Sequence, residues 1–220
     1  MAGLDDALLD GRLRTPRAAS VAGIVFGVLL ATTFVLIAVA LPRDPNAASS
    51  IDERRTAVTV AVLVAPLAGI AFLWFIGVVR DRVGELEDRF FSTVLIGSGL
   101  LFLAMTYVAT GVAAALVATF DVQPEAIVDG GTYRFAREVM FRITNLFALR
   151  MAGVFMVAFA TIGLRTRAFP RWLGLLTYVL AVVLLVVVTL NRWVLLVFPA
   201  WAVLVSAVIL VTTFRRPAAP

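Results

Sequence analysis

Long runs of apolar residues, separated by short polar breaks, cover most of the chain. About 20 apolar residues are enough to cross a bilayer core, and six runs reach or approach this length. They are residues 18–41, 57–79, 90–116, 140–164, 172–190 and 193–214. Because the backbone must satisfy its own hydrogen bonds inside a membrane, each run is expected to be a helix. The pattern therefore predicts an all-α polytopic membrane protein, in which residues 1–220 form one transmembrane domain, a bundle of six transmembrane helices.

Details of the apolar runs predict how some helices are shaped and paired. Pro66 and Pro199 each lie within a run, and a proline inside a helix removes a hydrogen bond and bends the helix, so we expect kinks in the second and sixth spans. Only Asn191 and Arg192 separate the fifth span from the sixth. Spans with so short a connection are expected to form a tight antiparallel hairpin, with Trp193 at the membrane surface.

The composition agrees with a membrane protein and removes several kinds of chemistry. Hydrophobic residues make up 62% of the chain and the mean hydropathy is +1.02, well above the values of a soluble domain. All 19 basic residues are arginine, and histidine and cysteine are absent. The chain therefore has no ligands for haem or for zinc sites of the histidine and cysteine type, and no thiol. We expect no cofactor and no metal, and the arginines are too scattered to form a face that binds nucleic acid.

The distribution of arginines predicts the orientation in the membrane. If the N-terminus lies inside the cell, the inner side receives 11 arginines and the outer side 6, while Arg142 and Arg150 lie within the fourth run. Short inner loops of membrane proteins are the ones enriched in basic residues. We therefore expect a multi-pass protein of the plasma membrane with both termini cytoplasmic.

The densest group of polar residues lies between the third and fourth spans, in residues 121–145. Three acids in this stretch precede a turn at Gly130-Gly131, after which Thr132 is expected to cap the fourth helix. The acids are Asp121, Glu125 and Asp129. Because they are scattered, we expect a hydrated loop in preference to a site for a divalent cation.

Helical spacing places a polar group on one face of the fourth helix. The group is Arg134, Glu138, Phe141, Arg142 and Asn145. Glu138 and Arg142 are four residues apart, in the order that favours an ion pair. Two interpretations remain open. The face lines an outward-facing, arginine-lined cavity that binds an anionic group, or it belongs to a helix end that extends past the membrane into water.

Arg150 lies inside the fourth apolar run, where a permanent charge is costly and normally has a partner. It is about 21 Å from the inner end of that run at about 1.5 Å per residue, so its side chain can extend toward the outer headgroups. The other five runs contain no Asp or Glu. The partner is therefore a carbonyl, a hydroxyl such as that of Thr106, Tyr107 or Tyr178, a lipid phosphate, an anionic ligand, or an acid of another chain. The arginine is accordingly structural, a contact with lipid or with a partner subunit, or a ligand-binding group.

Small residues recur at steps of four in two of the spans, a spacing that lets a second helix approach closely. They are Ala19, Gly23, Gly27 and Ala31 in the first span and Gly111 and Ala115 in the third. We expect both faces to pack tightly, against each other or against another subunit.

Four stretches of the sequence, residues 72–102, 148–157, 170–181 and 198–206, together resemble a group of uncharacterised multi-pass membrane proteins of actinobacterial type. The resemblance implies a bacterial origin, and the use of arginine in place of every lysine fits a genome rich in G and C. It implies no activity and no functional residue, since the group has no assigned activity.

Three functions are consistent with these patterns. The first, which the sequence favours, is a non-enzymatic accessory or scaffold subunit that packs with itself or with a partner membrane subunit through its small-residue faces. The second is a binder or carrier of an anionic lipid or small molecule, with Arg150 and the polar face of the fourth helix lining an outward cavity. The third, a membrane-embedded enzyme, would need Glu138 with Asp121 or Asp129 as its acid and base groups.

Overall fold

The computed structural model describes residues 2–41, 51–83, 89–123, 127, 131–166, 170–186 and 192–214. It describes their side chains except at 2–19, 51–53, 78, 80–83, 89, 192 and 213–214. Almost all of these residues are helical, and none of them belongs to a strand. Five helices are long and apolar enough to cross a membrane, and a further apolar helix is shorter. The predicted all-α bundle is therefore confirmed, and the chain is a membrane protein.

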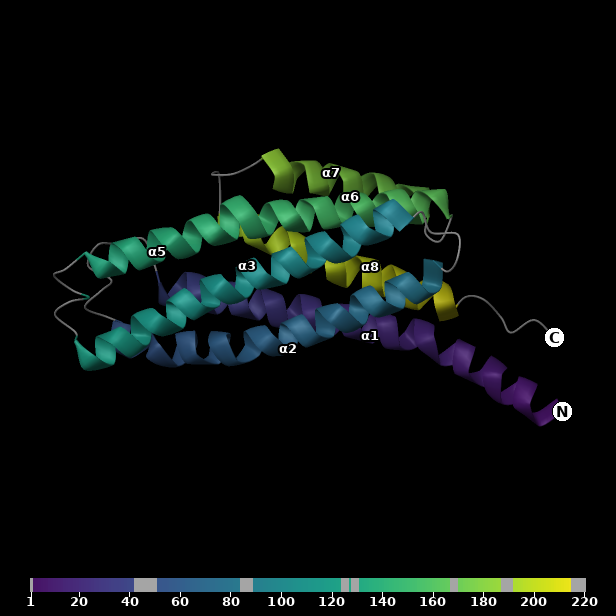
Figure 1. Ribbon diagram of the computed structural model, residues 1–220, viewed down its shortest axis with the longest axis horizontal. Coiled ribbons are helices and arrows are strands. Elements are labelled where there is room, and N and C mark those ends of the chain that lie inside the picture. Colours follow the sequence, from purple (N-terminus) through teal and green to yellow (C-terminus); the bar gives the residue numbers. More distant parts are fainter. Residues whose placement is uncertain are drawn as a thin grey trace.

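Successive helices run up and down the bundle (Figure 1). They are α1 (Ala2–Ala40), α2 (Ile51–Val83), α3 (Arg89–Val122), α5 (Thr132–Arg142), the π-helical turn η3 (Ile143–Ala148), α6 (Leu149–Arg165), α7 (Arg171–Val186), the 3₁₀ turn η4 (Arg192–Leu196) and α8 (Val197–Phe214). The segments α5, η3 and α6 continue one another as one rod. The start of α1 and the end of α8 lie at the same end of the bundle, which we call the proximal end; the opposite end is the distal end (Figure 1).

Several helices extend beyond the apolar runs. α3 has 34 residues and continues to Val122, past the run that ends at residue 116. α5 begins at Thr132, so the polar stretch before residue 140 is also helical. Hydropathy detects only the part of a helix that resembles lipid, whereas charged residues continue a helix readily when their side chains reach water.

Two local expectations have different outcomes. Pro199 lies in the first turn of α8, directly after η4, and the kink expected there stays a prediction. A proline is tolerated in a first turn, where its missing N–H has no helical partner. Thr132 does not cap α5: the preceding Gly131 has φ 72°, no side chain caps the helix, and the Phe135 N–H donates to the Gly131 carbonyl at 3.1 Å. Pro66 lies within α2.

The packing order differs from the expected hairpin of the last two spans. α1 packs against both α2 and α8, α3 packs against α2 and α6, and α7 lies mainly along α6. A Cβ on Gly153 of α6 would be 3.2 Å from the Ala181 carbonyl, so this glycine lets α7 approach closely. α7 touches α8 less extensively, and one contact is the hydrogen bond from Trp201 Nε1 to Thr177 Oγ1 at 2.9 Å.

A cluster of buried aromatic rings forms the centre of the bundle. It draws residues from α1, α2, α3, α6 and α8, namely Phe26, Phe72, Phe75, Phe102, Phe155, Phe159, Phe198 and Trp201. Phe72 is fully buried, and its ring centroid lies 4.4 Å from that of Phe26 and 5.1 Å from that of Phe155. Most of these pairs are tilted or edge-to-face, the arrangement that aromatic rings prefer. We call this set the aromatic core.

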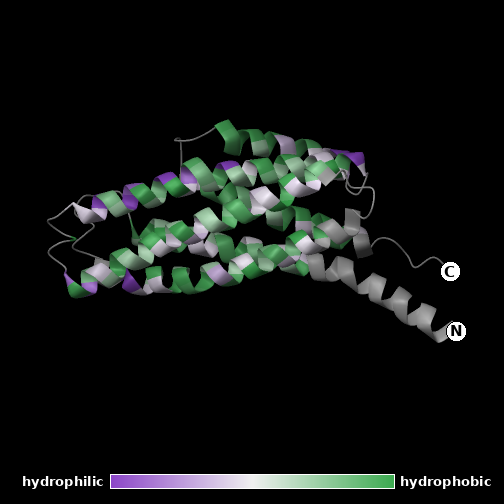
Figure 2. Ribbon diagram, in the orientation of Figure 1, coloured by the Kyte–Doolittle hydropathy of each residue, from purple (hydrophilic) through white to green (hydrophobic). Residues whose placement is uncertain are grey.

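A second, smaller core lies at the distal end. It joins the end of α1, the start of α2, the end of α3 and α5, and it contains Ala40, Leu41, Val58, Ala109, Ala113, Leu116, Val117, Ile127, Tyr133 and Met140. We call this set the distal core. Between the ends of the bundle the helices consist largely of hydrophobic residues (Figure 2). Many of these residues are exposed: Leu63 and Trp74 of α2 are each 67% exposed, and Phe90 and Val122 of α3 are 66% and 78% exposed.

Replacement of Phe72 by alanine is expected to destabilise the bundle by about 3–5 kcal/mol, because it opens a cavity where several helices meet. The neighbouring Leu73 is 46% exposed on the outer surface, so Leu73→Ala is expected to change stability by less than about 0.5 kcal/mol. Unfolding of the two purified variants in detergent measures the difference. Equal stabilities would show that the aromatic core does not hold the helices together.

Candidate functional site

The polar residues predicted as a site lie at the distal end, on α5 and the turn that follows it. α5 is strongly amphipathic: Tyr133 and Met140 face the distal core, whereas Arg134, Glu138 and Arg142 are exposed. The alternation arises from a 3.6-residue period of apolar positions. α5 therefore presents one polar face outward, and hydrophilic residues are frequent along this helix at the distal end (Figure 2).

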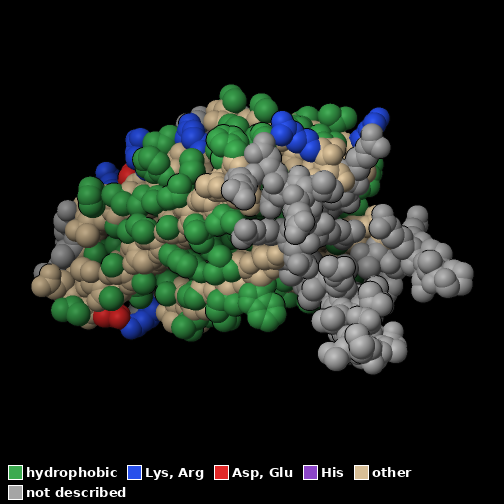
Figure 3. Space-filling model, turned by 45° about the vertical axis from the view of Figure 1, so that its right-hand side comes forward, with side chains coloured by type: hydrophobic (Ala, Val, Ile, Leu, Met, Phe, Trp, Pro, Cys, Tyr) green, Lys and Arg blue, Asp and Glu red, His purple; other side chains and the backbone are tan. Residues whose placement is uncertain are grey.

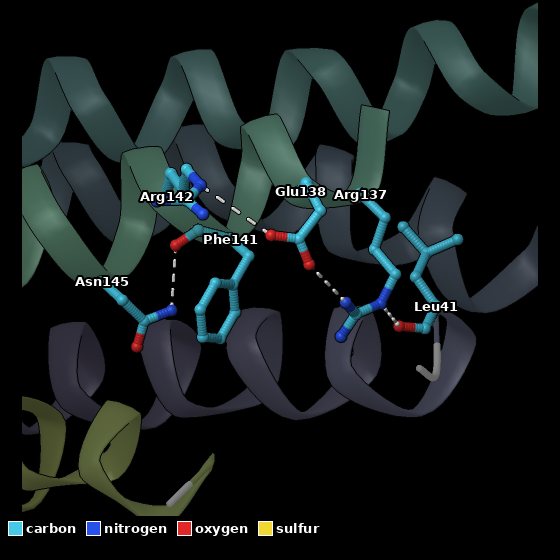
Figure 4. Close-up of polar contacts among 6 residues, drawn as sticks. All are labelled: Leu41, Arg137, Glu138, Phe141, Arg142 and Asn145. Carbon is cyan, nitrogen blue, oxygen red and sulfur yellow. Dashed lines mark hydrogen bonds and ion pairs between the residues drawn. The ribbon is translucent and has the colours of Figure 1, made fainter. Parts of the chain in front are cut away.

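The arginine that fastens α5 to the rest of the bundle is Arg137. Its side chain is 14% exposed, and its Nε donates to the carbonyl oxygen of Leu41 at 3.2 Å. Leu41 directly follows α1, and the last carbonyls of a helix lack partners within the helix and carry its partial negative charge. Arg137 therefore caps the distal end of α1 with a cation (Figure 4).

The sequence predicted Arg137 only as one of the six arginines on the outer side, and its capping role was missed. The signal was its spacing. Arg137 lies three, seven and eleven residues before Met140, Thr144 and Ala148, which are all buried, so it occupies the inner face of the helix. A basic residue on that face must reach a polar group of a neighbouring element.

Glu138 lies between two arginines (Figure 4). Its carboxylate oxygens are 3.5 Å from the Arg137 guanidinium and 3.8 Å from Arg142 Nε. The Glu138 side chain is 54% exposed and that of Arg142 is 73% exposed. Ion pairs with this exposure contribute between about 0 and 1 kcal/mol, so the predicted pair of Glu138 and Arg142 is present but weak.

A second ion pair ties α2 to α3 at the distal end. Arg55, near the start of α2, pairs with Asp121, near the end of α3. Of the three acids expected in a hydrated loop, Asp121 is thus used to join two helix ends, while Glu125 and Asp129 lie outside the described residues. Among the residues that the structure describes, no group of three or more acids could hold a metal ion.

Asn145 and Arg150 bond to carbonyls of their own helix. Asn145 Nδ2 donates to the Phe141 carbonyl at 3.0 Å, and the Arg150 guanidinium donates to the Leu146 carbonyl at 2.8 Å. The hydroxyls considered as partners for Arg150 are occupied elsewhere or lie against another helix. Thr106 donates to the Phe102 carbonyl, and Tyr178 bonds Thr161 at 2.7 Å. Arg150 therefore reaches one turn toward the distal end, as helical side chains do.

The stretch between Asn145 and Arg150 contains a widened helical turn. In η3 the Leu149 N–H bonds to the Thr144 carbonyl, five residues earlier, which is the π-helical register. Thr144 Oγ1 donates to the Met140 carbonyl at 2.9 Å. Side chains that bond back to the preceding turn in this way compete with the α-helical ladder. The turn was not predicted, and the adjacent Ile143, Thr144 and Asn145 are its only sequence signal.

The two small-residue faces have different surroundings. A Cβ on Gly23 would be 2.0 Å from Ser206 Oγ, and one on Gly27 would be 2.7 Å from the Pro199 carbonyl, so α1 uses these glycines to pack against α8. Ala31 is partly buried, and the side chain of Ala19 is outside the described part. In contrast, Gly111 has open space where a Cβ would stand, and Ala115 is exposed.

Comparisons with protein-family models, with curated proteins and with solved structures find no match to this chain. The geometry of the described residues is therefore the basis for any functional conclusion.

Replacement of Arg137 by methionine is expected to destabilise the protein by about 1–3 kcal/mol, because the apolar stem is kept while a charged hydrogen bond to a helix end is lost. Arg142→Met, five residues nearer η3 and largely exposed, is expected to cost less than about 0.5 kcal/mol. Amide hydrogen exchange of the last turn of α1 reports the difference, since fraying of that turn should accelerate only in the Arg137 variant. Equal protection in both would exclude a capping role.

Proposed function

We propose that this chain is a non-enzymatic integral membrane protein, an accessory or scaffold subunit that works by lateral association with a second copy of itself. The contact would lie on the outer side of α3, at Gly111 and Ala115. We further propose the location that the sequence predicted, a bacterial plasma membrane.

The observation that carries the proposal is the open small-residue face of α3. Gly111 has no atom within 4 Å of the position of a Cβ, and Ala115, four residues further, is exposed. On α1 the same spacing of small residues accommodates α8 at close range. A helix surface of this kind gains close backbone contact when another helix packs on it, and such contact drives helix association in lipid, where apolar burial alone gives little.

The polar residues support a structural role over a catalytic one. Asp121 pairs with Arg55, and Glu138 lies between Arg137 and Arg142. Of the candidate acid and base groups, the two that the structure describes, Asp121 and Glu138, therefore form ion pairs at helix ends.

Two observations support a proposal for the orientation in the membrane. The first helix begins and the last helix ends at the same, proximal end of the bundle (Figure 1). The arginine count favours the cytoplasm for that end. We propose that the proximal end is cytoplasmic, with both termini, and that the distal end faces outward.

The absence of native cysteine gives a direct test of self-association. Gly111→Cys is expected to form a disulfide-linked dimer when membranes are treated with a mild oxidant, because the two α3 helices would meet at this position. Gly77→Cys of α2 is the matched control, since Gly77 also has open space around its Cβ position. Dimer formation by both variants, or by neither, would contradict the proposed contact.

A second pair of cysteine variants tests the orientation. Phe135 of α5 is 72% exposed at the distal end, and Phe90 of α3 is 66% exposed at the proximal end. A membrane-impermeant thiol reagent added to intact cells is expected to label Phe135→Cys but not Phe90→Cys, and to label both after permeabilisation. The reverse pattern in intact cells would place the termini outside.

A further inference from the structure

The π-helical turn brings two arginines onto the same side of the α5–η3–α6 rod. Arg142 and Arg150 are eight residues apart, which in a regular α-helix separates two side chains by about 80° around the axis. A π turn takes up about one additional residue, so the effective spacing becomes about seven residues, or two turns, and the two side chains lie within about 20° of one line. η3 lies between them, from Ile143 to Ala148.

The depths of the two arginines match the boundary of a bilayer. α6 ends at the exposed Arg165, whose guanidinium lies 4.7 Å from the centre of the Phe91 ring. If that residue marks the proximal edge, Arg150 lies about 22 Å across a hydrocarbon core of about 30 Å. Arg142, about two turns or 11 Å further, lies at the level of the distal headgroups. Arg150 extends its guanidinium toward that level by bonding to the Leu146 carbonyl.

The surroundings of the pair are accessible to lipid. Arg150 is partly exposed, and Phe147, which lies between the two arginines in the sequence, is 51% exposed. Gly153 lies one turn proximal to Arg150. It packs against Ala181 and Leu185, which are close to the last residue of α7. In the space-filling view, arginine side chains lie along the upper edge of the molecule among hydrophobic ones (Figure 3). A guanidinium has five N–H donors, and the hydrogen bond to the Leu146 carbonyl uses only some of those of Arg150.

We propose that Arg142 and Arg150 form a binding site for the phosphate of an anionic phospholipid in the leaflet at the distal end. The lipid's acyl chains would lie along the apolar surface at Phe147, and its phosphate would stand between the two guanidinium groups. The pair favours a lipid with net negative charge because Glu138 offsets only one of the two cations. This site does not depend on the proposed self-association.

The test is native mass spectrometry of the full-length protein extracted from nanodiscs that contain equal amounts of phosphatidylglycerol and phosphatidylcholine. The wild type is expected to retain phosphatidylglycerol preferentially. Arg150→Gln and Arg142→Gln are each expected to bind it about tenfold more weakly, the effect of losing one charged hydrogen bond. Arg171→Gln, which removes an exposed arginine at the proximal end, should bind as the wild type does. Equal retention of phosphatidylglycerol by the wild type and the three variants would overturn the proposal.

An exchange of side chains separates position from charge. The double variant Phe147→Arg with Arg150→Phe has the composition and net charge of the wild type but moves the cation off the shared line. It is expected to lose the retained lipid, and retention would show that general charge attraction is sufficient. Excess inorganic phosphate should not displace the lipid; displacement would assign the site to a free anion. Thermal unfolding in detergent identifies folded variants, and if Arg150→Gln does not fold, the exposed Arg142 variant decides the result.

Discussion

The fold depends on the packing of large aromatic rings at the place where five helices meet. In a membrane, lipid tails are as apolar as the side chains, so burial alone does not hold helices together. Close contact between shaped surfaces must do so, through dispersion and ring geometry. Phe72 illustrates this requirement, since its ring lies within 6 Å of the rings of Phe26, Phe102 and Phe198, which come from three other helices. The glycines of α1 complete the arrangement, because they let α8 approach until Phe198 and Trp201 reach the centre.

The distal end is held by a different balance of forces. Its core consists mainly of aliphatic and small residues, and the helix ends around it are joined by charges. Arg137 bonds the end of α1, and Arg55 with Asp121 joins α2 to α3. The bond made by Arg137 fastens α5 to the end of α1, and the ion pair holds the neighbouring ends of α2 and α3 together. The polar face of α5 and the turn that follows it are consequently positioned by residues that are not themselves part of the proposed lipid site.

The sequence predicted the elements well and their details poorly. Apolar runs of about 20 residues left no alternative to membrane helices, and the all-α bundle is confirmed. The helix ends were less predictable, because charged residues such as Arg134 continue a helix that hydropathy no longer detects. η3 depends on competition between side-chain and backbone hydrogen bonds, which leaves little trace in composition. The partner of Gly23 could not be predicted at all, since the same glycine spacing suits an intramolecular helix and a second subunit equally. A backbone carbonyl was among the partners predicted for Arg150, but the sequence did not indicate that this carbonyl is that of Leu146.

The length of α3 also affects the surrounding bilayer. Its exposed residues from Phe90 to Ala118 are mainly apolar, over a rise of about 42 Å, while a typical hydrocarbon core is about 30 Å thick. This hydrophobic mismatch must be relieved by tilt, by local thickening of the bilayer, or by neighbours that cover the excess. Thickened lipid around one molecule would be shared if two such molecules met, so the mismatch would add to the self-association proposed for α3. The same elastic cost sorts the protein toward the thicker regions of a heterogeneous membrane.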